Sequence, residues 1–446
     1  MSTISVSSQH SPSIDLSGWP DLARYPRGLN RRIHSKVADK LFRQVAARLQ
    51  VRVELPDGTV LGAAAHDPQA PVMVMHRPEA FAARVGSGGL IGFGESYMAG
   101  DWSAPDLAGL LSVFAARMAT LVPEPLQKLR TLYVARHPRS EKNTTVNTRS
   151  NISRHYDLSN EMFEQFLDET LSYSSGLFDT PSIPGEGLSG ERCTIAEEPV
   201  AEPIWADLAD AQRRKIERLL DDAGVAAGTR VLEIGTGWGE LAIRAAARGA
   251  TVRTVTLSVE QQALARERIA DAGYAEQVQV DLLDYRKVDG QYDAIVSVEM
   301  IEAVGHEYWR TYFETIDRLL APGGTVAIQA ITMPHDRMLA TKGTYTWVHK
   351  YIFPGGFLPS TEAILDITRR HTSLRVTDRL SMGQHYAQTL RLWDERFSSR
   401  REDISRLGFD EVFTRMWHFY LEYSRAGFSS GYLDVQQVVL SRVATA

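Results

Sequence analysis

The sequence predicts an α/β protein in which a doubly wound, mostly parallel sheet follows a smaller domain of mixed α+β structure. Three observations predict it. The chain has 446 residues, which is more than one ordinary domain needs. From residue 230 onward, short apolar strands alternate with amphipathic helices. The stretch 138–151 is polar and basic, as linkers are, and predicts a domain boundary near residue 140.

Composition limits the classes of protein to consider. An apolar share of 43% and a charged share of 23% are typical of soluble globular proteins, and no apolar run is long enough to cross a membrane. A net charge of −6 argues against bulk nucleic-acid binding. The single cysteine, Cys193, excludes a disulfide framework and a thiolate metal cluster, so no metal site is expected. The N-terminus lacks the features of a secretory signal, so we expect a cytoplasmic protein.

Residues 1–19 form a polar tail, and residues 20–140 form the predicted N-terminal domain. Between Arg24 and Arg48 there are eight basic residues and one acid, and apolar side chains recur at every fourth position, at residues 33, 37, 41, 45 and 49. This pattern predicts a helix with a basic face. Two interpretations stay open: the helix meets anionic lipid headgroups, or it is a domain helix with a solvated basic face. A strand at 51–55, a turn at 56–58 and a return strand at 59–62 follow.

Residues 141–446 form the predicted second domain. Strands are predicted at 230–234, 251–257, 278–283, 294–298 and 325–328, the last after a turn at 321–324. Helices are predicted at 259–272 and 308–320. The segment 183–203 is rich in Gly, Pro and Glu, which predicts an irregular acidic surface loop and leaves a lid function open.

A glycine-rich turn follows the first strand of this domain. It contains Gly235, Gly237 and Gly239, which let the backbone turn tightly and approach a ligand. Glu233, before the first glycine, suits a cofactor that carries an ammonium group better than one that carries a pyrophosphate. The turn therefore predicts binding of S-adenosylmethionine rather than of a dinucleotide.

The ends of the next two strands support this interpretation. A dinucleotide site expects an acid at the end of the second strand, where this chain has none. Thr256 and Gln261 offer polar groups there instead. After the third strand, Asp284 can hydrogen-bond an adenine and Tyr285 can stack on it.

Several ordered motifs carry a resemblance to a known family. They are HYDLSN (155–160), YSS (173–175), LEIGTGWG (232–239), TLSVEQQ (256–262), MIEAVG (300–305), KYIFPGG with LPS (350–360) and YAQTLRLWDERF (386–397). From about residue 150 to its end, the chain resembles the cyclopropane-fatty-acid synthases, which are S-adenosylmethionine-dependent methyltransferases with a Rossmann-like class I fold. The motif GESYM (94–98) is similar to the extra domain of the phospholipid-acting members, which implies a membrane phospholipid as substrate.

The resemblance implies methyl transfer to the cis double bond of an unsaturated, oleoyl-like acyl chain of a phospholipid. A base then removes a proton from the product cation, and in the family a bound bicarbonate is thought to be that base. Carried over to this chain, the bicarbonate pocket is formed by Ser175, Glu302, Gln329, Ile331 and Tyr386. Tyr173 and Ser174 would meet the carboxylate of the cofactor.

Three positions depart from the family pattern. Ser175 replaces a cysteine, Gln329 replaces a histidine, and Glu299 stands where the family usually has a glycine. Two carboxylates, Glu299 and Glu302, would repel an anion between them, which makes bicarbonate binding doubtful. We hypothesise that Glu299 itself replaces the anion as base. An exposed Glu299, or one engaged by an arginine, is the alternative.

The timing of proton loss determines the product. Immediate loss closes a cyclopropane, whereas loss after a hydride shift leaves a methylene branch, as in actinobacterial relatives whose product a partner reductase converts to a 10-methyl acid. The remodelled base favours the methylene product slightly. We also expect peripheral association with the inner face of the membrane, and a homodimer is left open. Two other functions stay open: a small-molecule methyltransferase, and an inactive lipid-binding scaffold.

Overall fold

The computed structural model describes residues 14–23, 29–116 and 159–442. Most of the predicted polar tail, the linker and the boundary near 140 lie outside these residues. The chain divides into two compact units, one formed by Met1–Leu129 with Gly408–Tyr423 and the other by Arg130–Leu407 with Ser424–Ala446. Residues 408–423 thus group with the N-terminal region rather than with the rest of the C-terminal half. None of the described helices is long and apolar enough to cross a bilayer.

The first unit combines helices with a small sheet. Its helices are α1 (Pro20–Ala23), α2 (Leu29–Ala46), α3 (Pro78–Gly88), α4 (Leu90–Met98), α5 (Leu107–Ala116) and most of α21 (Glu411–Ser429). Its strands, β1 (Arg52–Glu54), β2 (Val60–Leu61), β3 (Val72–Met75) and β4 (Trp102–Ser103), pair in the order β2-β1-β3-β4. The predicted basic helix and the predicted hairpin are confirmed as α2 and as the antiparallel pair β1 and β2.

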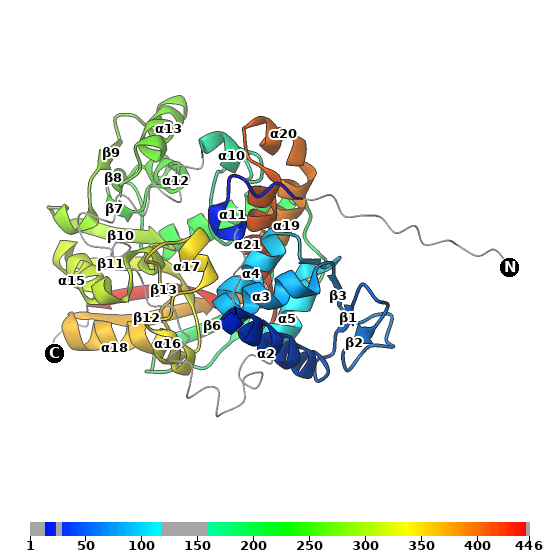
Figure 1. Ribbon diagram of the computed structural model, residues 1–446. Helices are drawn as coiled ribbons and strands as arrows, with labels where there is room; N and C mark the ends of the chain where they lie inside the picture. The colour runs from blue at the N-terminus through cyan, green and yellow to red at the C-terminus, as the bar shows by residue number, and fades with distance from the viewer. Residues whose placement is uncertain (1–13, 24–28, 117–158, 443–446) are drawn as a thin grey trace. The chain divides into compact units, whose positions relative to one another are not determined.

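The second unit is built on a nine-stranded sheet, shown in green to red in Figure 1. The strands are β5 (Ser182–Pro184), β6 (Arg192–Ala196), β7 (Arg230–Ile234), β8 (Thr251–Thr256), β9 (Val278–Leu282), β10 (Tyr292–Val298), β11 (Leu320–Thr332), β12 (Leu374–Ser381) and β13 (Asp434–Arg442). Their order is β5-β6-β12-β13-β11-β10-β7-β8-β9. The five strands from β11 to β9 are mutually parallel, whereas β13 runs antiparallel to both of its neighbours. The predicted doubly wound, mostly parallel sheet is confirmed.

The second unit also contains helices, most of which lie between strands of the sheet. They are α10 (Asn160–Glu164), α11 (Trp205–Asp222), α12 (Glu240–Ala247), α13 (Val259–Asp271), α14 (Ile301–Val304), α15 (Trp309–Leu319), α16 (His335–Thr341), α17 (Trp347–Tyr351), α18 (Thr361–His371), α19 (Gly383–Ser399) and α20 (Arg401–Arg406), with short 3-10 turns η2 (Tyr285–Lys287) and η3 (His306–Tyr308). The predicted helices 259–272 and 308–320 correspond to α13 and α15.

Two sequence expectations need correction. The segment 183–203 is not irregular throughout, because it contributes to β5 and forms β6, which pairs in parallel with β12. Those strands are short and their glycine-rich surroundings hide the alternation that marks a strand. The turn at 321–324 lies inside β11, where the register with β10 shifts between Tyr292 and Ala294. These residues therefore form an irregularity within β11 rather than a turn before it, and Gly323 has a φ of 79°.

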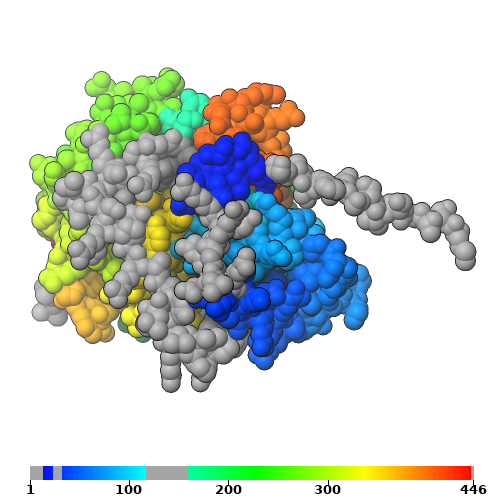
Figure 2. Space-filling model, in the orientation of Figure 1, coloured from blue at the N-terminus to red at the C-terminus, as the bar shows by residue number. Residues whose placement is uncertain are grey.

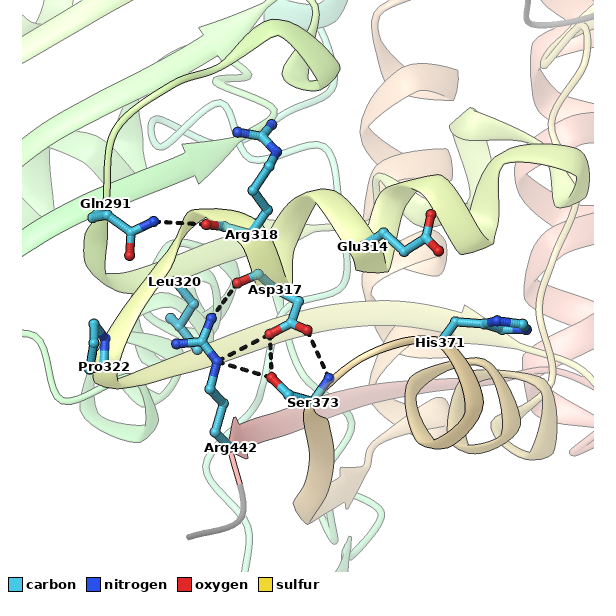
Figure 3. Close-up of a pocket in the computed structure, with 9 residues that line it drawn as sticks. All are labelled: Gln291, Glu314, Asp317, Arg318, Leu320, Pro322, His371, Ser373 and Arg442. Atoms are coloured by element: carbon cyan, nitrogen blue, oxygen red, sulfur yellow. Dashed lines mark hydrogen bonds and ion pairs between the residues drawn. The ribbon is translucent and has the colours of Figure 1, made fainter. Parts of the chain in front are cut away.

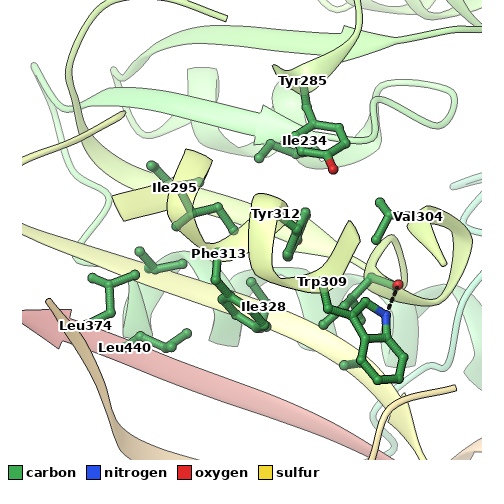
Figure 4. Close-up of a cluster of buried hydrophobic side chains, with 14 of the residues drawn as sticks. Ile234, Tyr285, Ile295, Val304, Trp309, Tyr312, Phe313, Ile328, Leu374 and Leu440 are labelled. Carbon is green, nitrogen blue, oxygen red and sulfur yellow. Dashed lines mark hydrogen bonds between the residues drawn. The ribbon is translucent and has the colours of Figure 1, made fainter. Parts of the chain in front are cut away.

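One face of the sheet packs on α15. Figure 4 shows part of this hydrophobic cluster, which contains Ile234, Ile295 and Ile328 from three adjacent strands together with Tyr312 and Phe313 from the helix. Burial of these apolar side chains fixes the three strands relative to one another. Because the cluster extends to the end of β7, it also supports the turn that follows.

Candidate active site

The sequence-predicted residues gather at the carboxyl ends of the parallel strands. The strand order reverses between β7 and β10, because β7 leads outward to β8 and β10 leads outward to β11. Ligands of open α/β sheets bind at such a reversal, outside the carboxyl ends of the strands. Glu233 lies near the end of β7, Glu299 directly follows β10, and Thr256 ends β8.

The turn after β7 has the backbone that its glycines predict. Gly235, Gly237 and Gly239 have φ values of 101°, 52° and 92°, a region that side chains with a Cβ rarely adopt. A Cβ at Gly235 would lie 2.5 Å from Cγ of Met300, whereas a Cβ at Gly237 would meet nothing within 4 Å. The turn is thus packed against the protein at Gly235 and open on the side of Gly237, where a ligand can approach the backbone.

Glu233 faces the same turn from a buried position. Only 3% of the residue is exposed, and its Oε2 has no hydrogen-bond partner among the described residues. Burial raises the pKa of this carboxyl to about 8, although a hydrogen bond with Thr254 on β8 opposes the shift. A buried carboxyl with one unsatisfied oxygen fits a cofactor that carries an ammonium group, because a cation would restore the ionised form.

The polar groups at the other strand ends are engaged with one another. Thr256 Oγ1 donates a 2.9 Å hydrogen bond to Gln261 Oε1, and the Asp284 carboxylate accepts from the backbone and side chain of Arg286. Tyr285 is 8% exposed and packs edge-on against Tyr312 at 5.6 Å, within the cluster of Figure 4. Most of its ring area is therefore used in the core.

The side chain of Glu299 lies at the centre of the predicted base site. Its Oε1 accepts hydrogen bonds from the backbone N–H of Ser175 at 3.0 Å and from Gln329 Nε2 at 2.9 Å. Its Oε2 accepts a 2.7 Å hydrogen bond from the Tyr386 hydroxyl. Three of the five positions that the resemblance assigns to an anion pocket therefore bind this carboxylate. The arginine-paired or freely exposed Glu299 that was the alternative is not observed.

The backbone of Glu299 is unusual. Its φ is 50°, and Leu171 is the other non-glycine residue with a positive φ among those described. A residue with a Cβ pays roughly 1 kcal/mol or more in this region, and such strain concentrates at functional sites. Its backbone N–H donates to the carbonyl of Gln329 at 2.8 Å, which anchors the strained residue to β11.

Glu302 lies beside Glu299, in the first turn of α14. Its Oε1 accepts from the backbone N–H of Ile331, while its Oε2 is buried without a hydrogen-bond partner among the described residues. Burial, and then repulsion by Glu299, raise the pKa of Glu302 to about 8. Burial also raises the pKa of Glu299, against the three donors that lower it. Glu299 accepts hydrogen bonds from three donors and Glu302 from one, so a negative charge is better stabilised on Glu299 than on Glu302.

The segment that carries Tyr173 and Ser174 is fixed from two sides. The backbone N–H of Leu177 donates to the carbonyl of Ala211 on α11, and that of Gly176 donates to Thr389 Oγ1 on α19. The Tyr173 ring packs at 5.3 Å from Trp393 of α19. Ser174 is 5% exposed, so its hydroxyl is set among protein groups rather than in open solvent.

Two further residues belong to the site but are not predicted from the sequence. Lys215 of α11 is 1% exposed, and its Nζ donates a 2.6 Å hydrogen bond to Ser174 Oγ. Gln437 of β13 is also 1% exposed, and its Nε2 donates to Gln329 Oε1 at 3.1 Å. A signal for Lys215 exists, since it lies four residues from both Ala211 and Leu219 on the buried face of the helix.

A separate hollow of about 410 Å³ lies at the opposite edge of the sheet, shown in Figure 3. Gln291 and Leu320, at the amino ends of β10 and β11, line it. Its cation Arg442 is engaged by Asp317 and Ser373, and Arg318 by the carbonyl of Val288. Because it lies at the amino ends of these strands, away from the predicted residues at their carboxyl ends, this hollow is not the candidate site.

Known proteins are similar to this chain over most of its length. A family model described as mycolic acid cyclopropane synthetase matches residues 143–438. The chain is 54% identical over 440 residues to the tuberculostearic acid methyltransferase UfaA1 of Mycobacterium tuberculosis, covering 99% of both chains. It is 31% identical over 380 residues to the cyclopropane-fatty-acyl-phospholipid synthase of Escherichia coli, covering 84% of this chain and 88% of that one.

A solved structure gives the same result. The mycolic acid cyclopropane synthase CmaA1, complexed with SAH and CTAB, superposes with a TM-score of 0.55 at 28% identity. The match covers 66% of this chain and 97% of that one.

Proposed function

The chain belongs to the cyclopropane synthase family and is an S-adenosylmethionine-dependent lipid methyltransferase, and from this premise we propose its substrate, its base and its product. The substrate is the cis double bond of an unsaturated, oleoyl-like acyl chain of a phospholipid. The similarity to a phospholipid-acting synthase over 84% of this chain supports the choice of a phospholipid.

The glycine turn and Glu233 hold the cofactor, which supplies an electrophilic methyl group when bound. The open side of Gly237 admits the ligand to the backbone, and the unsatisfied Oε2 of Glu233 is the acceptor for its ammonium. Thr256, Gln261 and the groups at 284–285 complete the outer part of this site. Tyr173 and Ser174 approach it from the other side.

The role of Glu299 as base rests on one observation: its carboxylate accepts three hydrogen bonds where the resemblance expects an exogenous anion. The bound cofactor would supply its methyl group as an electrophile: the alkene electron pair would form a bond to the methyl carbon while the bond from that carbon to the sulfonium sulfur breaks, which would leave a cation on the acyl chain. Glu299 then takes a proton from that methyl group. Three fixed donors hold the carboxylate still, and the residue remains partly exposed, so a bound acyl chain can reach it.

The product that we propose is a methylene-branched acyl chain. A hydride shift first moves the cation to the carbon that bears the new methyl group, and loss of a methyl proton to Glu299 then forms the exocyclic double bond. The 54% identity to a tuberculostearic acid methyltransferase favours this branched product over a cyclopropane. A partner reductase and a homodimer remain predictions.

The substrate and product are tested by mass spectrometry of lipids from cells that express the protein, grown with and without oleate. We expect oleate-derived chains to gain one carbon and two hydrogens. The methylene and cyclopropane products have equal mass, so NMR of the purified lipid must distinguish them. Unchanged acyl masses would refute lipid methylation, and cyclopropane proton signals would refute the methylene product.

The base is tested with Glu299→Gln and Glu299→Gly, assayed with and without added bicarbonate. The amide keeps the shape but accepts no proton, so we expect activity at least 100-fold below that of the parent chain. The glycine variant relieves the positive φ and vacates the space of the carboxylate, so bicarbonate should restore part of its activity. Bicarbonate-dependent, near-full turnover in Glu299→Gln would exclude Glu299 as base.

We also propose that α2 attaches the protein to anionic membrane surfaces. Ile33 and Val37, which begin its apolar stripe, are 57% and 51% exposed, whereas Leu49 at the other end of the stripe is 2% exposed. The exposed Lys36 and Lys40 are close to them along the helix. Exposed apolar side chains among lysines are typical of interfacial helices.

A further inference from the structure

A buried ammonium group stands beside the base site without a role in the chemistry proposed so far. Lys215 is 1% exposed, and its Nζ donates to Ser174 Oγ at 2.6 Å. A buried lysine is costly unless opposite charges and hydrogen bonds compensate it. One neutral hydroxyl does not compensate a full charge, so the compensation must come from nearby carboxylates.

Three carboxyl groups attract this ammonium, those of Glu299, Asp168 and Glu240. Glu240 is already paired with two arginines, Arg244 at 2.8 Å and Arg268 at 3.1 Å. Asp168 accepts from the backbone N–H of Thr170 at its Oδ2. Glu299 accepts three hydrogen bonds from neutral donors, and it forms no ion pair with any of the described residues. Among these residues, Lys215 therefore supplies the positive charge that the surroundings of Glu299 otherwise lack.

Two sets of hydrogen bonds connect Lys215 to the donors of Glu299. The ammonium holds Ser174, and the N–H of the next residue, Ser175, donates to Glu299. By the second route, Gln437 Nε2 donates both to the Lys215 carbonyl at 3.0 Å and to Gln329 Oε1. That bond turns the Nε2 of Gln329 toward Glu299. The same turn of α11 therefore fixes two of the three donors and contributes a charge.

We propose that Lys215 is a positioning residue that keeps Glu299 ionised, so that a partly buried carboxylate is ready to accept the proton of the substrate cation. This inference rests on the proposed function of Glu299 as base. The charge has a second effect, because it weakens the hold of Glu299 on the proton that it has just taken up. Lys215 thus favours both the start of a turnover and the return to the ionised state.

The charges around the pair set the direction of the pH effect. Burial raises the pKa of Glu299, and Lys215 lowers it. Burial, and then the adjacent Glu299, raise the pKa of Glu302 to about 8, so a protonated Glu302 adds no second negative charge beside Glu299. Burial lowers the pKa of Lys215 to about 8, against the attraction of Glu299, Asp168 and Glu240, so the ammonium is charged at neutral pH. Loss of this cation should make Glu299 take up a proton at a higher pH.

The test compares Lys215→Gln with the parent chain and with Arg213→Gln, a control on the exposed side of the same helix. The glutamine amide can still donate to Ser174 but carries no charge. We expect the acid limb of the pH profile of kcat, at saturating cofactor, to move up by about one pH unit, a tenfold loss on that limb. The Arg213 variant should keep the parent profile. Lys215→Met is the second variant, in case the amide disturbs folding.

A second measurement does not depend on methyl transfer. Infrared difference spectra over a pH series report the protonated carboxyl of Glu299, identified by its loss in Glu299→Gln. That band should appear at a higher pH in Lys215→Gln than in the parent. An unmoved band and an unmoved acid limb would overturn the role of Lys215. If the band moves but the parent methylates no lipid, the proposed function fails and the electrostatic role of Lys215 stands.

Discussion

At the level of single residues, the centre of the site is a pair of neighbouring carboxyl groups with different hydrogen bonding. Glu299 accepts three hydrogen bonds and Glu302 accepts one, while one oxygen of Glu302 remains buried without a partner among the described residues. A protonated Glu302 can approach an ionised Glu299 without repulsion, as in other carboxyl pairs. The positive φ of Glu299 costs conformational free energy, which the hydrogen bonds around its side chain offset.

The neutral state of Glu302 predicts a pH dependence of stability. Its pKa is about 8 in the folded chain and near 4.5 when exposed, so the folded state retains a proton that the unfolded state has lost. The free energy of unfolding should therefore fall as the pH rises from 5 to 8. Glu302→Gln should remove this contribution and gain on the order of 1 kcal/mol or more relative to the parent at pH 8.

Thermal melts of the parent and of Glu302→Gln across this range test the prediction. The matched control is Glu267→Gln, an exposed acid on α13, which should follow the parent. Parallel stability curves for the parent and for Glu302→Gln would show that Glu302 is ionised in the folded chain.

At the scale of elements, the turn between β7 and α12 has two kinds of glycine. Gly235 has no room for a Cβ, because Met300 lies against it, so its requirement is structural. A Cβ at Gly237 would meet no protein atom within 4 Å. Apart from the positive φ, the reason for a glycine at this position must therefore be the close approach of the ligand. The two glycines serve different purposes although they occur in one motif.

Gly237→Ala should therefore lower cofactor affinity more than it lowers stability. Its matched control is Gly273→Ala, which also has a positive φ, 84°, and nothing within 4 Å of the added Cβ. Both variants should lose roughly 1 kcal/mol of stability through backbone strain. Calorimetry should find at least a tenfold weaker binding of the cofactor in Gly237→Ala alone. Equal affinities in the two variants would mean that the ligand does not approach residue 237.

At the scale of the whole molecule, the chain combines a catalytic unit with a unit that carries no residue of the candidate site. Within that first unit, α2 presents exposed apolar and basic side chains, and it belongs to the blue surface in Figure 2. An enzyme whose substrate is a membrane lipid needs contact with the bilayer, and none of the described helices spans one. The proposed attachment by α2 would supply that contact.

Attachment through α2 predicts salt-sensitive binding to vesicles. The parent chain should sediment with vesicles that contain anionic lipid and dissociate as the ionic strength rises. The double variant Ile33→Ser, Val37→Ser should bind at least tenfold more weakly. Leu339→Ser, an equally exposed leucine in the second unit, is the control. Binding that is indifferent to salt and to the α2 variant would indicate that α2 only packs within its domain.

The framework of this protein follows from local patterns in its sequence. Alternating strands and helices, the turn around Gly235 and the carboxyl residues at the strand ends are local patterns, because strand and helix periods and glycine backbones are properties of neighbouring residues. The tertiary structure decided what gathers around Glu299. Its donors Ser175 and Tyr386 lie 124 and 87 residues away along the chain, and Lys215 comes from a further helix. Hydrogen bonds and charges between such distant segments depend on how the elements pack, which no local pattern records.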